Sequence, residues 1–179
     1  AVDPRRVLQR SLAELAAHGL GLRCGLELEF HLHRIDDDGL ATAQAGWPGP
    51  PPAVRHGHPG YRLLSDEHAD LVAEPLAIVR RTALALGLPL RSLEVELGPS
   101  QVEAVFAPTD ALTAADQMTL FRNATRQALR RAGWHASFVC VPPLPGSVAS
   151  GWHLHQSLVD GDGRNAMPAT APVADVQDA

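Results

Sequence analysis

Three features of the sequence predict an α+β fold with mainly antiparallel strands and flanking helices. Segments with the apolar period of helices alternate irregularly with segments that have the period of strands. Two of the strand segments are separated by a short Gly-Pro-Ser turn, which favours antiparallel neighbours. No internal repeat is visible, and 179 residues are enough for one domain with a hydrophobic core.

The first predicted element is a helix that begins after Asp3. Asp3 is a suitable N-cap, and Pro4 fits the first helical position. Residues 23–34 then have the pattern of a strand. Residues 36–60 are rich in Pro, Gly and Asp, which predicts a long functional or mobile loop with its Pro-rich part at residues 44–60.

The rest of the chain is predicted to hold two helices and several strands. A helix over residues 70–86 contains Pro75, which suits a true first turn at that point. A helix over residues 113–132 has the clearest apolar face, and Gly133 ends it. The predicted strands cover residues 92–96, 101–106, 135–141 and 151–159.

Composition excludes several classes of function. The net charge of -5 argues against a nucleic-acid partner or an anionic membrane surface. All 15 basic residues are Arg, so a lysine phosphate loop and a Schiff-base lysine are excluded on this chain. Cys24 and Cys140 lie in apolar runs, which predicts two buried free thiols. With no membrane-span pattern and no recognisable leader, we expect a cytoplasmic protein.

Glu27 and Glu29 lie inside an apolar strand, beside His31. Residues two apart on a strand share a face, so both carboxylates point the same way. Their like charges repel, and a divalent cation would compensate for them. The alternative is that this face is simply the solvated face of an edge strand.

Glu96 and Glu103 flank the Gly-Pro-Ser turn, and Gln101 shares a strand face with Glu103. If the two strands form a hairpin, both carboxylates converge near its mouth. The alternative is a pair of ordinary solvated carboxylates near a turn.

His153, His155 and Ser157 alternate along the last predicted strand and therefore share a face. Alternating imidazoles suit metal or phosphate contacts, although a polar surface stripe gives the same pattern. Oxygen-rich ligand sets suit Mg²⁺ or Mn²⁺, and a pair of such ions can clamp a phosphoryl group. The histidines in or near the long loop are expected to be solvated: His56, His58 and His68.

Together these segments resemble the glutamine synthetase family, and the resemblance spans nearly the whole chain in order. It implies that the fold is part of the family's catalytic domain. The segments that carry it are Gly25-Leu26-Glu27-Leu28-Glu29-Phe30, Glu96-Leu97-Gly98-Pro99-Ser100-Gln101-Val102-Glu103 and Ser150-Gly151-Trp152-His153-Leu154-His155-Gln156-Ser157-Leu158.

The resemblance implies two metal sites. Glu29, Glu96 and Glu103 would hold the metal near the glutamate carboxylate. Glu27 and His153 would hold the metal near the ATP phosphates, completed by a carboxylate that this chain lacks. These five residues are therefore the expected catalytic and metal-binding set.

The same resemblance implies the contacts with substrate and nucleotide. Gln101 and Gly151 would bind substrate, and His155 and Ser157 would lie toward ATP. The implied reaction is that of an ATP-dependent ligase with Mg²⁺ or Mn²⁺, which joins the γ-carboxylate of glutamate to ammonia or an organic amine through a γ-glutamyl phosphate.

Departures from the family pattern favour the organic-amine branch of the family. Val148 and Ala149 stand where Asn-Gly is usual, Trp152 replaces a Met, and Val141 stands where a Lys is common. Tyr61, after a Gly, is similar to the family's Gly-Tyr near the ammonium pocket.

The resemblance also predicts an incomplete domain. Residues 1–163 would be catalytic domain, without the small N-terminal β-grasp domain and without the C-terminal part, and residues 164–179 would be a disordered tail. The parent protein would be a homo-oligomeric ring. The alternative function is a catalytically inactive fragment or an assembly module.

Overall fold

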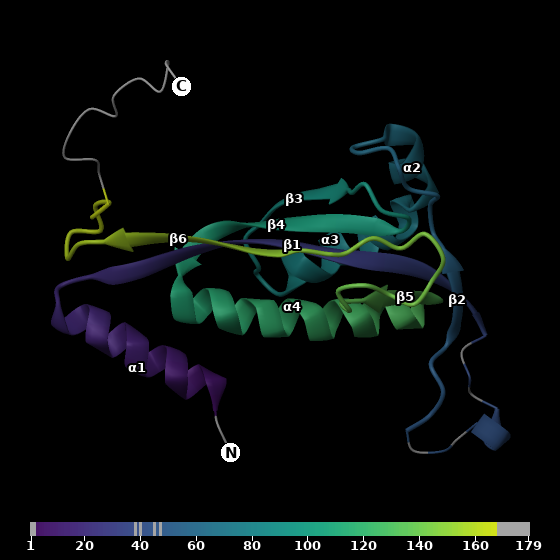
Figure 1. Ribbon diagram of the computed structural model, residues 1–179, viewed down its shortest axis with the longest axis horizontal. Helices are drawn as coiled ribbons and strands as arrows, with labels where there is room; N and C mark the ends of the chain where they lie inside the picture. Colours follow the sequence, from purple (N-terminus) through teal and green to yellow (C-terminus); the bar gives the residue numbers. More distant parts are fainter. Residues whose placement is uncertain (1–2, 38, 40, 45, 47, 168–179) are drawn as a thin grey trace, which may run out of the picture.

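The computed structural model describes residues 3–37, 39, 41–44, 46 and 48–167. They form a single sheet, and helices pack against one of its faces (Figure 1). In chain order the elements are α1 (Pro4–Ala17), β1 (Gly21–Asp37), the 3-10 turn η1 (Thr42–Gln44), β2 (Ala53–His56), α2 (Asp66–Leu71), α3 (Ala73–Ala85), β3 (Leu90–Val95), β4 (Gln101–Asp110), α4 (Ala111–Arg131), β5 (Trp134–Ser137) and β6 (Trp152–Val159).

The long strand β1 is the centre of the sheet. Its first half pairs with β4 and β6, on opposite edges, and its second half pairs with β5 and β2. The hairpin partner β3 extends the sheet beyond β4, and every one of these pairings is antiparallel. The predicted fold class is therefore confirmed, whereas the alternative that Glu27 and Glu29 lie on an edge strand is wrong.

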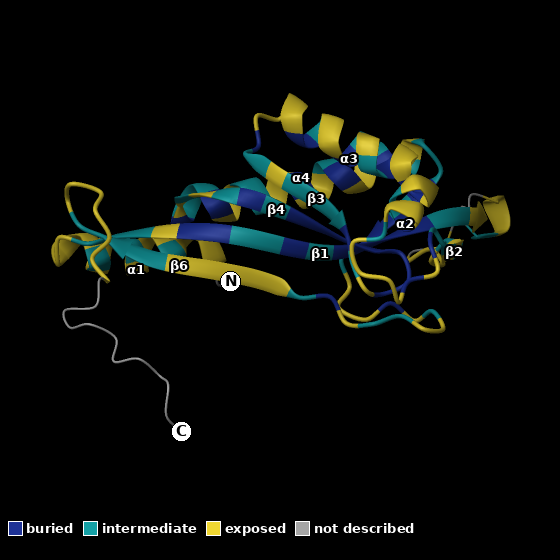
Figure 2. Ribbon diagram, turned by 90° about the horizontal axis from the view of Figure 1, so that it is seen from above, coloured by how far each residue is buried: buried dark blue, intermediate teal, exposed yellow. Residues whose placement is uncertain are grey.

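The two faces of β1 have different partners. Leu28, Phe30 and Leu32 are buried in the main core, together with side chains of α3 and α4 such as Val79 and Phe121. The alternate residues of β1 point to the opposite face because side chains alternate along a strand. Figure 2 shows the buried centre of β1 next to β6, which is exposed along most of its length. The face that carries the glutamates is thus open beside β6.

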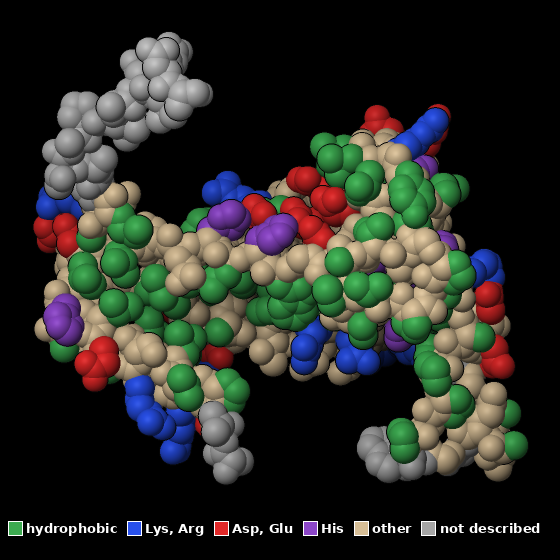
Figure 3. Space-filling model, in the orientation of Figure 1, with side chains coloured by type: hydrophobic (Ala, Val, Ile, Leu, Met, Phe, Trp, Pro, Cys, Tyr) green, Lys and Arg blue, Asp and Glu red, His purple; other side chains and the backbone are tan. Residues whose placement is uncertain are grey.

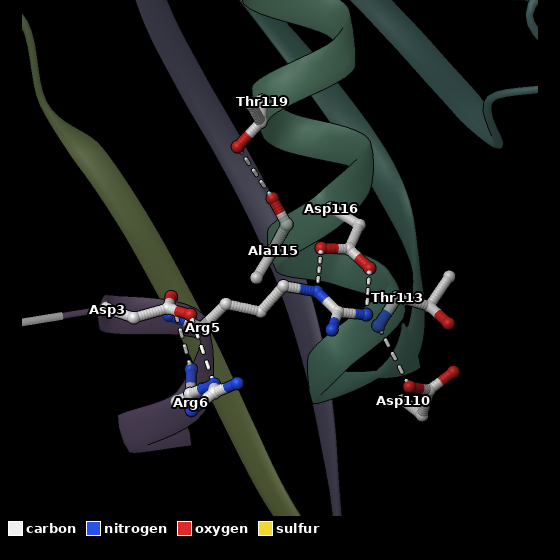
Figure 4. A network of polar contacts seen from close by, with 8 residues as sticks. All are labelled: Asp3, Arg5, Arg6, Asp110, Thr113, Ala115, Asp116 and Thr119. Carbon is white, nitrogen blue, oxygen red and sulfur yellow. Dashed lines mark hydrogen bonds and ion pairs between the residues drawn. The ribbon is translucent and has the colours of Figure 1, made fainter. Parts of the chain in front are cut away.

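Helix α1 begins as predicted, and a salt bridge ties it to α4. The side chain of Asp3 caps the helix by accepting hydrogen bonds from the backbone N–H groups of Arg5 and Arg6. Arg5 donates from two nitrogens to Asp116 of α4, at 2.9 and 3.0 Å (Figure 4). Such two-pronged pairs fix geometry, but this one is exposed and contributes little to stability.

Several elements differ from the sequence-based expectations. Most of the helix predicted over residues 70–86 is α3, with Pro75 in its first turn as predicted, but residues 70 and 71 belong to the separate helix α2, which ends just before Val72. The loop over residues 36–60 contains η1 and the short strand β2, which the Pro-rich composition around it concealed. Of the strand predicted over residues 135–141, only residues 135–137 pair with β1, as part of β5, which begins one residue earlier at Trp134.

The expected exposure of several polar side chains is also wrong. His58 and His68 are buried rather than solvated, because the segment after β2 folds back over the sheet. Cys140 is exposed, whereas Cys24 is buried as predicted, and both thiols are free. Within the predicted tail, Asn165 bridges to Val159 at the end of β6. Residues 168–179 of that tail lie outside the described residues.

Candidate metal centre

Antiparallel register brings the predicted glutamates together. Glu29 of β1 lies directly opposite Glu103 of β4, and Glu27 lies opposite His153 of β6. Glu96 follows the last residue of β3, where the backbone turns back toward β4. Three strands and one turn therefore supply one cluster, which lies on the open face of the sheet. In Figure 3 acidic and histidine side chains gather along this face.

The cluster contains two groups of potential metal ligands. One is Glu29, Glu96 and Glu103, and the other is Glu27, Glu103 and His153, and in each group the ligand atoms lie within 4.8 Å of one another. The sequence resemblance assigned Glu103 to the first group alone. The structure makes Glu103 common to both, because it lies opposite Glu29 and its carboxylate is also within reach of Glu27 and His153.

The electrostatics of the cluster show a surplus of negative charge. Burial, and then the charges of Glu27, Glu96 and Glu29, raise the pKa of Glu103 to about 7. Burial also raises the pKa of Glu96. In the described part of the chain, the basic side chains that pair with this cluster are His153 and His155. Carboxylates with one imidazole and too little positive charge fit a hard divalent cation such as Mg²⁺ or Mn²⁺.

Two imidazoles of β6 hold Glu27 on the solvent side of the cluster. His153 Nδ1 lies 3.2 Å from one carboxylate oxygen, and His155 Nε2 lies 3.1 Å from the other. Hydrogen bonds, first that of His155 and then that of His153, lower the pKa of Glu27. Because a carboxylate only accepts, Nδ1 of His153 carries the hydrogen, which leaves Nε2 with a lone pair in the neutral ring.

Gln101 and Gly151 lie on the other side of the cluster, around Glu29. Gln101 is 2% exposed and donates from Nε2 to Glu29 Oε2 at 3.0 Å. The backbone N–H of Gly151 donates to the same oxygen at 2.7 Å. Both predicted substrate-binding residues therefore contact a metal-ligand candidate directly.

One predicted site residue lies away from the cluster, and one residue that was not predicted lies beside it. Ser157 lies farther along β6, opposite Arg23, and its hydroxyl contacts Asn165 at 3.4 Å. Glu94 lies opposite Glu103 in the register of β3 and β4, a position that sequence reasoning did not single out. The two-residue spacing from Glu94 to Glu96 was the signal available for it.

An apolar rim borders the cluster beside Glu96. The backbone N–H of Tyr61 donates to Leu97 O at 2.5 Å, and that of Leu64 donates to Val95 O at 3.1 Å. Tyr61 and Leu64 have positive φ angles of 62° and 54°, which are strained for residues with side chains. The side chains of Tyr61, Leu64 and Leu97 are nevertheless exposed, by 63%, 59% and 48%.

None of the described helices is both long and apolar enough to span a lipid bilayer. The model of the glutamine synthetase catalytic domain matches residues 1–175 of the chain.

Individual relatives agree with the family match. A γ-glutamylanilide synthase of Acinetobacter is 43% identical over 165 residues, which is 90% of this chain and 33% of the relative. A γ-glutamylethanolamide synthetase of Streptomyces coelicolor is 30% identical over 97% of this chain and 36% of its own length. A solved GmaS/ADP complex superimposes with a TM-score of 0.72 at 24% identity, over 90% of this chain and 35% of that one.

The chain thus spans about a third of the length of these relatives. With the family model matched over nearly its whole length, the chain belongs to the glutamine synthetase family of ligases, within the catalytic domain.

Proposed function

We propose that the protein carrying this chain is an ATP-dependent ligase that joins the γ-carboxylate of glutamate to an organic amine. ATP phosphorylates the carboxylate, and the amine then displaces phosphate from the γ-glutamyl phosphate. The observation that carries the proposal is the pair of ligand groups that share Glu103. Two adjacent cation sites are the usual arrangement for phosphoryl transfer between anionic groups.

The residues of this chain have distinct parts in the proposed reaction. Glu29, Glu96 and Glu103 would hold one cation, and Glu27, Glu103 and His153 the other. Bound there, the cations supply positive charge that offsets repulsion between the γ-phosphoryl group and the attacking carboxylate. His155 fixes Glu27 from outside the second group, and with Ser157 it lies on the strand face that we assign to the nucleotide.

Two observations support an organic amine over ammonia. Two of the relatives reported above are named for an anilide and an ethanolamide product. The apolar rim beside Glu96 suits an amine that has an apolar group. In Figure 3 hydrophobic side chains gather next to the acidic cluster, on the side of α2. Among organic amines we therefore favour those with aryl or alkyl substituents.

The test is phosphate release by the full-length protein with ATP, glutamate and Mg²⁺ or Mn²⁺. Ammonia, ethanolamine, isopropylamine, a polyamine and aniline would each be supplied as the amine. We expect release only when glutamate and an amine are both present, and highest release with an apolar amine. Highest release with ammonia would overturn the organic-amine assignment.

No release with any amine, from a protein that still binds Mn²⁺, would favour the alternative of an inactive assembly module. Mass spectrometry of the product identifies the γ-glutamyl amide directly. A homo-oligomeric ring and a cytoplasmic location remain parts of the proposal, and sedimentation of the full-length protein tests the first of them.

A further inference from the structure

The carboxylate of Glu29 has one oxygen that is already occupied. Oε2 accepts the hydrogen bond from Gln101 Nε2 at 3.0 Å and the one from the backbone N–H of Gly151 at 2.7 Å. We infer that Gln101 is a positioning residue, which holds this carboxylate so that Oε1 faces the cation. This role differs from the substrate contact that the sequence resemblance implied for Gln101.

The orientation of the Gln101 amide follows from its partners. Its Oε1 accepts from the backbone N–H of Gly98 at 3.0 Å, and its Nε2 donates to the carbonyl of Ala149 at 3.0 Å. A flipped amide would place a donor against an N–H and an acceptor against a carbonyl and a carboxylate. Gln101 can therefore only donate to Glu29, and burial keeps water from competing for these bonds.

The surrounding backbone leaves the amide little freedom. A Cβ atom on Gly98 would lie 2.7 Å from Gln101 Oε1 and 2.2 Å from a methyl of Val148, so only glycine fits this turn. Nε2 also lies 3.1 Å from the hydroxyl of Ser150, which contacts His31 Nδ1 at 3.3 Å. The amide thus joins the turn after Glu96, the segment before β6 and the interior of the sheet.

This bracing reaches only one of the two ligand groups. Glu27 has exposed imidazole partners, with His153 and His155 51% and 63% exposed. Loss of the Gln101 amide should therefore weaken the cation site that contains Glu29 and leave the one that contains Glu27 much less affected. This selectivity distinguishes positioning from general damage to the fold. The inference rests on the metal centre of the proposed function.

The experiment is a two-site Mn²⁺ titration of the full-length protein by calorimetry and electron paramagnetic resonance. Glu27→Ala and Glu29→Ala variants identify which site belongs to which group. In Gln101→Met we expect Mn²⁺ affinity of the Glu29 site to fall about 10- to 100-fold, as is typical when a partner of a metal ligand is removed. The Glu27 site should change less than about threefold.

Gln127→Met is the matched control, because Gln127 is an exposed glutamine of α4, and it should leave both sites unchanged. If Gln101→Met fails to fold, Gln101→Asn keeps an amide in the pocket but is one methylene too short to reach Glu29, and the same selective loss is expected.

Unchanged Mn²⁺ affinity at the Glu29 site, or equal weakening of both sites, would overturn the positioning role while leaving the proposed function intact. A wild-type protein that binds no Mn²⁺ would overturn the metal centre itself, and with it this inference. Phosphate release from the amine panel judges the ligase reaction separately.

Discussion

The two sides of the acidic cluster are built differently. On one side Glu29 is held by the buried amide of Gln101 and by a backbone N–H group. On the other side Glu27 is held by His153 and His155, two exposed imidazoles of β6. We call these the braced side and the exposed side.

The difference follows from what covers the face of β1 that carries the glutamates. Beyond Glu29 the same face continues into His31 and His33, which are 0% and 1% exposed. Ser150, in the segment before β6, contacts His31. His33 packs against His56 of β2 and His135 of β5. Before Glu29 the face is open beside β6. In the proposed metal centre, a single strand face would therefore supply a rigid ligand at its covered half and an adjustable ligand at its open half.

The largest expected effect comes from Glu103, which belongs to both sides. Glu103→Ala removes one ligand from each group, so we expect Mn²⁺ affinity at both sites to fall more than about 100-fold, beyond what loss of a ligand's partner costs. Turnover of the full-length protein should be abolished. Glu94→Ala is the control, because Glu94 lies opposite Glu103 but belongs to neither ligand group. Turnover retained in Glu103→Ala would contradict the site.

Acidification should weaken both sides together through the same residue. The pKa of Glu103 is raised from 4.5 to about 7, so below pH 7 a proton competes with the cation. We expect Mn²⁺ affinity to be about tenfold lower at pH 6 than at pH 8, since one proton is displaced per binding event. Calorimetry in two buffers of different ionisation enthalpy measures that proton.

In the metal-free protein, folding stability depends on pH in the opposite direction to Mn²⁺ affinity. Between pH 4.5 and about 7 the folded state holds a proton that the unfolded chain has released, so stability falls as the pH rises through this window. Glu103→Gln should remove this pH dependence. If the stability of the metal-free wild type rose with pH across this window, and that of Glu103→Gln did not, the raised pKa of Glu103 would be contradicted.

Gly151→Ala is a smaller change, and we expect it to affect the exposed side. A Cβ atom at this position would lie 2.5 Å from His153 Nε2, so the ring must rotate away. Rotation off a preferred conformation costs about 0.5–1.5 kcal/mol, which corresponds to about 2- to 10-fold in Mn²⁺ affinity at the Glu27 site. Gly161→Ala is the control, because a Cβ atom there meets nothing within 4 Å. If Mn²⁺ affinity fell only at the Glu29 site, the change would act on the braced side and would contradict this prediction.

The smallest expected effect concerns the interior behind the braced side. His33 packs against His31, His56 and His135, and burial, then the nearby imidazole charges, lower its pKa from 6.5 to about 3. As the pH falls below 6.5 the unfolded chain takes up the proton first, so stability is lost toward acid.

In His33→Phe the fall in Tm between pH 7.5 and pH 5 should therefore shrink by about 2–4 °C. His18→Phe is the control, because the imidazole of His18 is exposed. An equal acid shift in wild type and His33→Phe would show that this imidazole does not contribute to acid sensitivity.

Much of the local structure was predictable because it depends on neighbouring residues. Asp3 and Pro4 specify the start of α1, and Gly133 follows the end of α4 as expected. Pro75 indicated the first turn of α3, but the apolar period continues across Val72, so α2 was not predicted as a separate helix. Strand β2 was missed for a related reason, because a four-residue strand depends on its pairing with β1 rather than on its own pattern.

The sequence by itself determined which residues form the cluster. The two-residue spacings put Glu27 and Glu29 on one face, and the ordered motifs named Glu96, Glu103 and His153 with them. Only the tertiary structure decided that Glu103 serves both groups, that Gln101 braces Glu29, and that His58 and His68 are buried. The physical reason is that alternation along a strand is a local property, whereas strand register and loop cover bring together residues far apart in the chain.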